Sequence, residues 1–161
     1  MEPSALGLAL ALLGGGLALG LGGAGSSIGI GLAGMTASGV VSEDPKKFGR
    51  LMPFVALPGT QGIYGFVLFF IIAVVKLSML TEPLLPTVAQ GWQLLFIGFS
   101  AGIVLLASGM YQGKVSAAAI GILVKKPDQA GKGLVLAAFV ETYAVIALVA
   151  ALLVILQMKI G

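Results

Sequence analysis

Four long apolar stretches cover most of this 161-residue sequence, at residues 4–42, 51–80, 88–124 and 131–158. The first, third and fourth have apolar cores longer than the roughly 20 residues with which an α-helix crosses a bilayer. Backbone polar groups cannot stay unpaired in lipid, and the alternating pattern of barrel strands is absent, so the stretches should be helices. The sequence therefore predicts an all-α membrane protein with four transmembrane helices.

The composition supports this class and argues against several others. Charged residues make up 9% of the chain and the mean hydropathy is +1.11, whereas soluble domains carry about 25% charged residues. The net charge of +3 does not indicate nucleic-acid binding. Cysteine and histidine are absent, which removes thiol chemistry and the usual general base and metal ligand. We find no nucleophile–base pair, and we expect neither an active site in this chain nor a signal peptide at its N-terminus, which lacks a basic segment.

The basic residues gather in two of the three connections. The first connection holds Lys46, Lys47 and Arg50, the third holds Lys125, Lys126 and Lys132, and the middle connection and the C-terminus hold Lys76 and Lys159. Basic residues favour the cytoplasmic side of a membrane. We therefore expect residues 43–50 and 125–132 in the cytoplasm, with the middle connection and both termini outside.

The sequence contains an internal repeat with a shift of 82 residues and no gaps. The matched pairs include Gly20 with Gly102, Ser26 with Ser108, Gly31 with Gly113, Pro45 with Pro127, Gly49 with Gly131 and Thr60 with Thr142. Each unit is a helical hairpin, and two such hairpins, residues 1–82 and 83–161, are fused in parallel orientation. Parallel repeats suggest rotation about the membrane normal.

A single acid, Glu141, lies inside the apolar run from residue 133 to residue 156. Insertion scales put the cost of an acid in mid-membrane at roughly 3 kcal/mol, so such a residue is by default a functional candidate. The alternative is a protonated Glu141 that only makes a hydrogen bond between helices. The repeat aligns Glu141 with Gly59, so only the second hairpin has an acid here.

Other polar groups lie at the same expected depth as Glu141. Leu57, Thr60, Gln61 and Tyr64 follow helical i, i+3, i+4, i+7 spacing and share a face beside two prolines, Pro53 and Pro58. Counting at about 1.5 Å per residue places Thr60, Gln112 and Glu141 roughly 14 to 20 Å from the cytoplasmic ends of their stretches. We therefore expect a polar cluster near mid-membrane.

The chemistry of this cluster favours a monovalent cation. A hard cation prefers several oxygen ligands, and one carboxylate neutralises one positive charge. A divalent ion would leave uncompensated charge in an apolar environment. A proton needs only Glu141 and one acceptor, and the two glutamines, the threonine and the proline-disrupted backbone exceed that need. The residues thus favour Na⁺, with H⁺ as the alternative.

At these residues the sequence resembles the membrane-ring proteolipids, the c or K subunits, of V-type and A-type rotary ATPases. Nearly the whole chain carries the resemblance, most specifically in "LPGTQGIYGF", "YQGKVSAAAIGILVKKP" and "FVETYA". In sodium-translocating members the ion ligands fall at positions that match Leu57 (through its carbonyl), Thr60, Gln61, Gln112 and Glu141. The position that matches Tyr64 holds the carboxylate by a hydrogen bond.

The resemblance implies a ring of several copies in a bacterial or archaeal cell membrane. The ring would turn against a stator subunit that carries an arginine, and central-stalk subunits would contact its cytoplasmic loops. This chain would be a non-catalytic subunit, because ATP is hydrolysed elsewhere in such complexes. Two other interpretations, a non-rotary channel and a purely structural proteolipid, fit less well: a channel needs a continuous polar path, and a structural protein has no need of Glu141. Lys114, deep in the third stretch, has no assigned role; we expect it to snorkel or to pair within the assembly.

Overall fold

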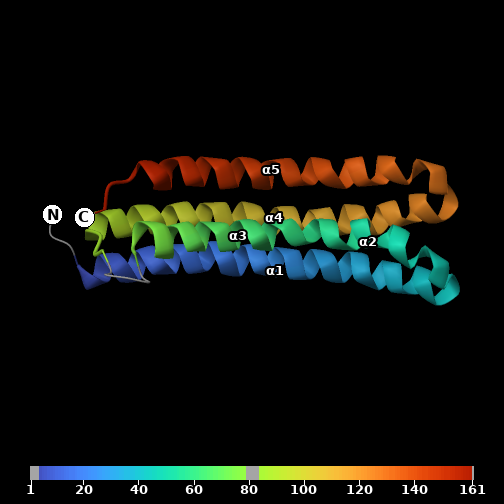
Figure 1. Cartoon of the computed structure of the whole chain (residues 1–161), viewed down its shortest axis with the longest axis horizontal. Coiled ribbons are helices and arrows are strands. Elements are labelled where there is room, and N and C mark those ends of the chain that lie inside the picture. Colours follow the sequence, from blue (N-terminus) through green and yellow to red (C-terminus); the bar gives the residue numbers. More distant parts are fainter. Residues whose placement is uncertain (1–3, 79–83, 161) are drawn as a thin grey trace.

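The computed structural model describes residues 4–78 and 84–160, and in them four long helical segments lie side by side (Figure 1). The first is α1, Ala5–Glu43. The second runs through η1 Pro45–Lys47, α2 Phe48–Ala56, η2 Leu57–Gly59, α3 Thr60–Phe70 and η3 Ile71–Lys76, the third is α4 Val88–Lys125, and the fourth comprises η4 Pro127–Gln129 and α5 Ala130–Gln157. All four segments are long and apolar enough to cross a membrane. The predicted fold class is confirmed.

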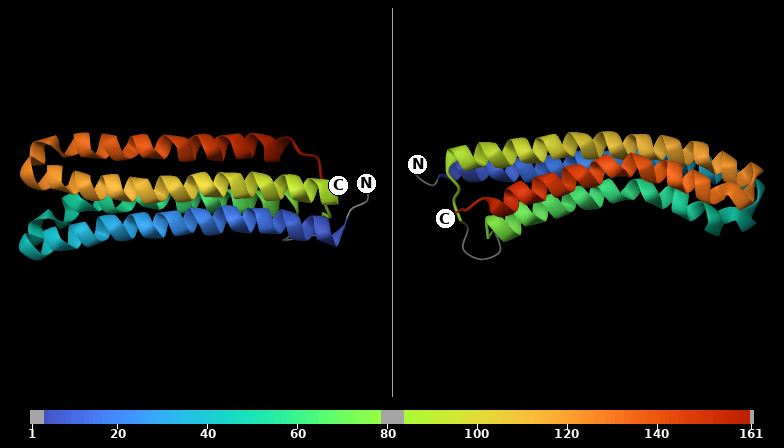
Figure 2. Two further views of the ribbon diagram at one scale, coloured as in Figure 1. Left: turned by 180° about the vertical axis from the view of Figure 1, so that it is seen from behind. Right: turned by 90° about the horizontal axis from the view of Figure 1, so that it is seen from above.

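The four segments form two hairpins that stand side by side in the same direction. Both ends of the chain lie at one end of the bundle, and the turns after α1 and α4 lie at the other (Figure 1). α1 packs along α4, α3 packs along α1, and α5 packs along α4. The whole bundle bends gently along its length (Figure 2). The expected boundary between the two hairpins, at residues 82 and 83, falls in the segment 79–83, which lies outside the described residues.

Glycines set the close contact between α1 and α4. Gly14, Gly25 and Gly29 of α1 face Gly98, Gly109 and Gly113 of α4. A Cβ at Gly109 would lie 2.6 Å from the carbonyl carbon of Gly25, a separation that no real side chain tolerates. The two backbones can meet only because these positions lack side chains, as in other membrane helix pairs.

The second segment is a helix with three irregular parts. Pro53 lies inside α2, and Pro58 lies in the 3₁₀ turn η2. Neither proline has a backbone N–H to donate to the preceding turn. The segment ends in six residues of π-helix, and Lys76 is the last of them. We predicted Lys76 in the middle connection, but in the structure it is the last residue of the helical part.

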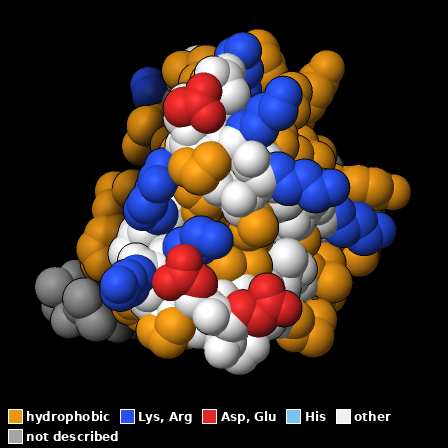
Figure 3. All heavy atoms as spheres, turned by 90° about the vertical axis from the view of Figure 1, so that its right-hand side faces the viewer, with side chains coloured by type: hydrophobic (Ala, Val, Ile, Leu, Met, Phe, Trp, Pro, Cys, Tyr) orange, Lys and Arg blue, Asp and Glu red, His pale blue; other side chains and the backbone are white. Residues whose placement is uncertain are grey.

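Figure 3 shows the turn end of the bundle, where most of the charged side chains of the chain gather. Asp44 accepts a hydrogen bond from the backbone N–H of Lys46 at 3.2 Å and so caps the turn after α1. The guanidinium of Arg50 donates to the carbonyl of Pro127 at 2.7 Å. This bond links the turn end of the first hairpin to that of the second.

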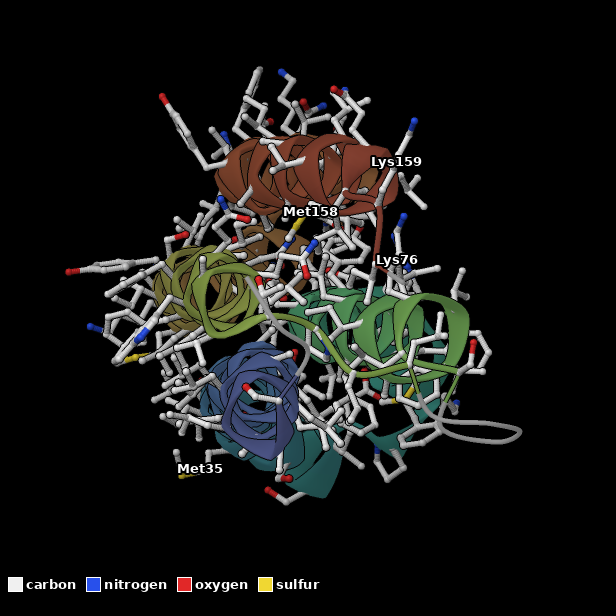
Figure 4. All side chains as sticks on the ribbon, turned by 90° about the vertical axis from the view of Figure 1, so that its left-hand side faces the viewer. Met35, Lys76, Met158 and Lys159 are labelled. Carbon is white, nitrogen blue, oxygen red and sulfur yellow. The ribbon has the colours of Figure 1, made fainter. Side chains whose placement is uncertain are left out.

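The opposite end of the bundle is fastened by two contacts with the C-terminal end of the chain. The Lys76 ammonium donates to the carbonyl oxygens of Leu156, at 2.9 Å, and Met158, at 2.7 Å (Figure 4). The Gln90 side-chain amide donates to the carbonyl of Lys159 at 2.7 Å. Carbonyls at a helix C-terminus have no donor within the helix. Here Lys76 of the first hairpin and Gln90 at the start of α4 donate to carbonyls at the end of the chain.

Candidate functional site

Glu141 lies in the middle of α5 on the side that faces α3 and α4, and its side chain is half-buried. Ala137 and Ala144, at i−4 and i+3, are fully buried on that side. Because these neighbours are small, α5 approaches α4 closely enough for side chains of α3 and α4 to reach the carboxylate.

Two side chains from different helices donate hydrogen bonds to Glu141. The hydroxyl of Tyr64, on α3, donates to Oε1 at 2.5 Å. The amide Nε2 of Gln112, on α4, donates to Oε2 at 3.3 Å and also to the carbonyl of Ala137 at 3.2 Å. The expectation that Gln112 and Glu141 lie at one depth is confirmed. Side chains of α3 and α4 thus each hold one oxygen of the carboxylate.

Gln61 and Gln112 form a fully buried pair of amides beside this carboxylate. Both have no exposed surface. The Nε2 of Gln61 donates to Oε1 of Gln112 at 2.6 Å and to Oγ of Ser108 at 3.0 Å. The Oε1 of Gln61 is buried and accepts no hydrogen bond from any described residue. An unpaired buried acceptor costs about 1–3 kcal/mol, so this oxygen is available to a ligand that can supply positive charge.

Leu57 begins the 3₁₀ turn η2, and Thr60 is the first residue of α3, directly before Gln61. The Thr60 hydroxyl donates to the carbonyl of Leu57 at 3.3 Å, and both side chains are half-buried. Hydrogen bonds thus join Gln61, Gln112, Glu141 and Tyr64 into one cluster. Among the described residues no hydrogen bond joins Leu57 or Thr60 to Glu141, although both lie within one turn of Gln61 along the chain.

Two serines support the cluster, and sequence reasoning gave neither of them a role. Ser26, on α1, accepts a hydrogen bond from the backbone N–H of Gly62 at 2.8 Å. Ser108, on α4, accepts from Gln61 and donates to the carbonyl of Val140 at 3.0 Å. The available signal was the repeat itself, because Ser26 and Ser108 are matched positions in which a polar residue recurs inside an apolar helix.

Lys114 lies within one turn of Gln112 along α4 but takes no part in the cluster. Its side chain is exposed, and its Nζ lies 4.7 Å from the centre of the Tyr111 ring, as in a cation–π contact. That Lys114 snorkels to the membrane surface or pairs within the assembly stays a prediction.

Comparison with known proteins assigns the fold to a family. The family model for the C subunit of ATP synthase matches residues 13–72 and again residues 95–154, so the two matches are offset by the 82 residues of the repeat. The chain is 44% identical over 126 residues to the V-type sodium ATPase subunit K of Enterococcus hirae, a match that covers 77% of this chain and 76% of the relative. It is 42% identical over 123 residues to the A-type ATP synthase subunit K of Methanocaldococcus jannaschii, a match that covers 75% of this chain but only 52% of that longer protein. The chain therefore belongs to the family of ATP synthase C subunits, as one of the c or K proteolipids of V-type and A-type ATPases, and is an integral, multi-pass membrane protein that assembles into a ring.

Proposed function

We propose that this protein is the rotor-ring subunit of a V-type Na⁺-transporting ATPase and that each copy carries one Na⁺ at Glu141. The observation that carries the proposal is a chain of hydrogen bonds in which the fully buried Gln61 donates to the fully buried Gln112, and Gln112 donates to the intramembrane acid. A relative that is 44% identical over most of the chain is named a sodium ATPase subunit. A site built for a proton alone would have no use for the two amides.

The proposed ligands are the carboxylate of Glu141 and the oxygens of Leu57 (carbonyl), Thr60, Gln61 and Gln112. Gln112 directs its Nε2 at Glu141. A half-turn of its amide group would direct Oε1 there instead, and the Nε2 of Gln61, which now donates to that Oε1, would move away with it. Oε1 of Gln61 is already without a donor. Tyr64 would continue to hold Oε1 of Glu141, so that the carboxylate keeps its orientation whether or not the ion is bound.

Charge explains how such a site would couple ion binding to rotation. A loaded site holds one positive and one negative charge and is neutral overall, whereas an empty carboxylate is costly in lipid. The empty site would therefore stay near the stator, where an arginine offsets its charge, and the loaded site could turn through the lipid. ATP hydrolysis in the peripheral part of the complex would drive the rotation.

The proposed orientation places the turn end in the cytoplasm of a bacterial or archaeal cell. Basic residues outnumber acidic ones at this end (Figure 3), as the positive-inside rule requires of cytoplasmic connections. The turns at residues 43–50 and 125–132 would contact the central-stalk subunits, and the termini would lie outside. Arg50, which already binds the other turn, would help to hold this surface together.

Carbodiimide labelling of the purified ring tests the function. The reagent attacks a protonated acid in an apolar site, so we expect it to modify Glu141 selectively. Na⁺ should slow the labelling at neutral pH, because a bound ion keeps the carboxyl ionised. Binding of ²²Na⁺ to the same ring should disappear in Glu141→Gln, whose amide keeps the shape of the acid and should leave the ring assembled.

The same experiment separates the alternatives. Labelling of Glu141 that does not change with millimolar Na⁺ would identify the cargo as H⁺. ATP-driven ion transport that persists in a complex with Glu141→Gln would remove Glu141 from the transport cycle altogether and revive the channel interpretation.

A further inference from the structure

Ser108 contacts two sides of the polar cluster, although it is not one of the proposed ligands. Its hydroxyl donates to the backbone carbonyl of Val140 on α5 at 3.0 Å and accepts a hydrogen bond from Nε2 of Gln61, also at 3.0 Å. Val140 directly precedes Glu141 in the chain. Ser108 therefore joins the backbone beside the acid to a buried amide of the first hairpin.

The direction of these two hydrogen bonds is fixed by the chemistry of their ends. A backbone carbonyl can only accept, so the hydrogen of the Ser108 hydroxyl is used on Val140. A serine hydroxyl has one hydrogen and two lone pairs, so Ser108 can offer Gln61 only a lone pair. The amide group of Gln61 must therefore present its nitrogen, and not its oxygen, to Ser108.

A second chain of hydrogen bonds, through Gln112, imposes the same orientation on Gln61. The carbonyl of Ala137 accepts from Nε2 of Gln112 at 3.2 Å, which leaves Oε1 of Gln112 to face Gln61. That oxygen can only accept, so it too requires the nitrogen of Gln61, which donates to it at 2.6 Å. Two backbone carbonyls of α5, those of Ala137 and Val140, thus set the orientation of both amides.

The two chains use both hydrogens of the Gln61 amide and leave its oxygen unused. An amide nitrogen carries two hydrogens, and here one goes to Ser108 and the other to Gln112. Oε1 of Gln61 is buried and accepts no hydrogen bond from the residues that the structure describes, and the whole side chain has no exposed surface. A neutral oxygen that is buried, unpaired and held in one orientation is well suited to a hard cation.

The contact with Ser108 matters most when an ion binds. The half-turn of the Gln112 amide that the proposed sodium site requires draws Nε2 of Gln61 along, because that nitrogen donates to the turning oxygen. The hydrogen bond to Ser108 holds the same nitrogen, involves no atom of Gln112 and limits this movement. The Gln61 amide therefore does not turn over while Gln112 turns.

We propose that Ser108 is a positioning residue of the sodium site, which holds the Gln61 amide so that its oxygen, and not its NH₂ group, faces the ion. Without the Ser108 hydroxyl the amide is free to turn over, and its NH₂ group then repels a cation. The inference rests on the proposed sodium function, because a proton at Glu141 needs no oxygen from Gln61.

The matched serine of the repeat, Ser26, has a different role. Ser26 and Ser108 are both 6% exposed, and each accepts a hydrogen bond from α3. Ser26 accepts from the backbone N–H of Gly62, a group that cannot turn over within a helix. The two serines thus hold neighbouring residues of α3, one by its backbone and the other by its side chain, and only Ser108 sets the orientation of an amide.

Binding of ²²Na⁺ to the purified ring of Ser108→Ala tests this role. The variant leaves one hydrogen of the buried Gln61 amide without an acceptor, so the Na⁺ concentration for half-maximal binding should rise roughly 5- to 150-fold. Carbodiimide labelling of Glu141 without Na⁺ should keep the wild-type rate, because a protonated acid makes no use of the Gln61 oxygen. A general disturbance of packing would change both measurements, and a changed labelling rate would overturn the proposal.

Ser116→Ala is the matched control, because it removes another buried hydroxyl from the same helix. Ser116 has no exposed surface, and its hydroxyl has no hydrogen-bond partner among the described residues. This variant should bind Na⁺ with wild-type affinity. If it weakened Na⁺ binding as much as Ser108→Ala does, the loss would belong to the packing of α4 and the role of Ser108 would be rejected.

A double-mutant cycle with Gln61→Leu shows whether Ser108 acts through the amide. Once Gln61 is replaced there is no amide to orient, so adding Ser108→Ala should change the Na⁺ affinity by less than about twofold. An equal further loss in both backgrounds would contradict the proposal, and so would wild-type affinity in Ser108→Ala alone. The sodium proposal survives either of these results, whereas a wild-type ring that binds no ²²Na⁺ would remove both proposals.

Discussion

At the scale of single residues, the acid of this membrane protein is held by donors from two other helices. Tyr64 and Gln112 each direct a donor at one carboxylate oxygen. Behind Gln112, the buried Gln61 has an oxygen that accepts no hydrogen bond within the described part of the chain, although its Nε2 donates to Gln112. A cation beside Glu141 would use that oxygen and offset the cost of burying it.

Replacing the two amides should separate sodium from proton carriage. In the double variant Gln61→Leu, Gln112→Leu, Glu141 keeps its Tyr64 partner and can still bind a proton, but two neutral oxygens are lost. Each lost ligand should weaken Na⁺ binding by about 1–3 kcal/mol, roughly 5- to 150-fold. The Na⁺ concentration needed for half-maximal ATP-driven transport, measured at fixed pH, should rise steeply, or the requirement should vanish.

Ser116→Ala is the control for this measurement. Ser116 lies one turn beyond Gln112 on the same buried face of α4, and its hydroxyl has no hydrogen-bond partner among the described residues. Its removal should leave the Na⁺ requirement unchanged. If the double variant also kept the wild-type Na⁺ requirement, the amides would be packing groups and the sodium assignment would lose its main support.

At the scale of the elements, the second helical segment is interrupted by a 3₁₀ turn directly before Thr60 and Gln61. The 3₁₀ turn Leu57–Gly59 separates α2 from α3, and the N–H of Thr60, the first residue of α3, donates to the carbonyl of Leu57. The N–H groups that follow lie in the first turn of a helix, where donors depend on caps. Gly59, at the N-cap position of α3, has no side chain to cap them. Ser26 of α1 caps the N–H of Gly62 instead. A neighbouring helix thus stabilises the break beside Gln61.

Ser26→Ala should therefore destabilise the protein in a way that an exposed serine does not. Loss of a helix cap costs about 1 kcal/mol, with a range of roughly 0.5–2 kcal/mol. The unfolding temperature of the detergent-purified protein, followed by circular dichroism, should fall. Ser38→Ala is the matched variant, because the exposed Ser38 hydroxyl binds only the carbonyl of Gly34 in its own helix. Equal unfolding temperatures for both variants would show that the cap contributes nothing.

At the scale of the whole molecule, the two hairpins are joined by contacts of different kinds along the bundle. Glycines bring α1 and α4 close together from Gly7 and Gly91 to Gly29 and Gly113. At the turn end Arg50 binds the carbonyl of Pro127, and at the other end Lys76 binds carbonyls of the C-terminal segment. Polar contacts thus lie at both ends, where water and headgroups are. Between them the close glycine packing surrounds the polar cluster of the site, which also joins the hairpins, through Gln61 and Tyr64.

Lys76→Met should loosen the end of α5 without disturbing the site. Methionine keeps much of the apolar length of lysine but cannot donate to Leu156 and Met158. A loss of about 1 kcal/mol would speed local opening roughly fivefold. Hydrogen exchange of the amides in residues 152–160, followed by mass spectrometry, should quicken by that factor. In Lys159→Met, which removes an exposed side chain, exchange should stay at the wild-type rate, and the prediction fails if the two variants behave alike.

The sequence by itself determined the class of fold, the repeat and the depth of the acid. Hydrophobic length decides whether a segment crosses a membrane, and residue counting along a helix fixes depth, so both are local properties. Tertiary structure alone decided which groups meet: Gln61 with Ser108, Ser26 with Gly62, and Lys76 with the end of α5. Each of these pairs joins residues at least 36 positions apart. Periodicity shows which residues share a face of one helix, but only the packing of α1 against α4 decides which faces of different helices meet.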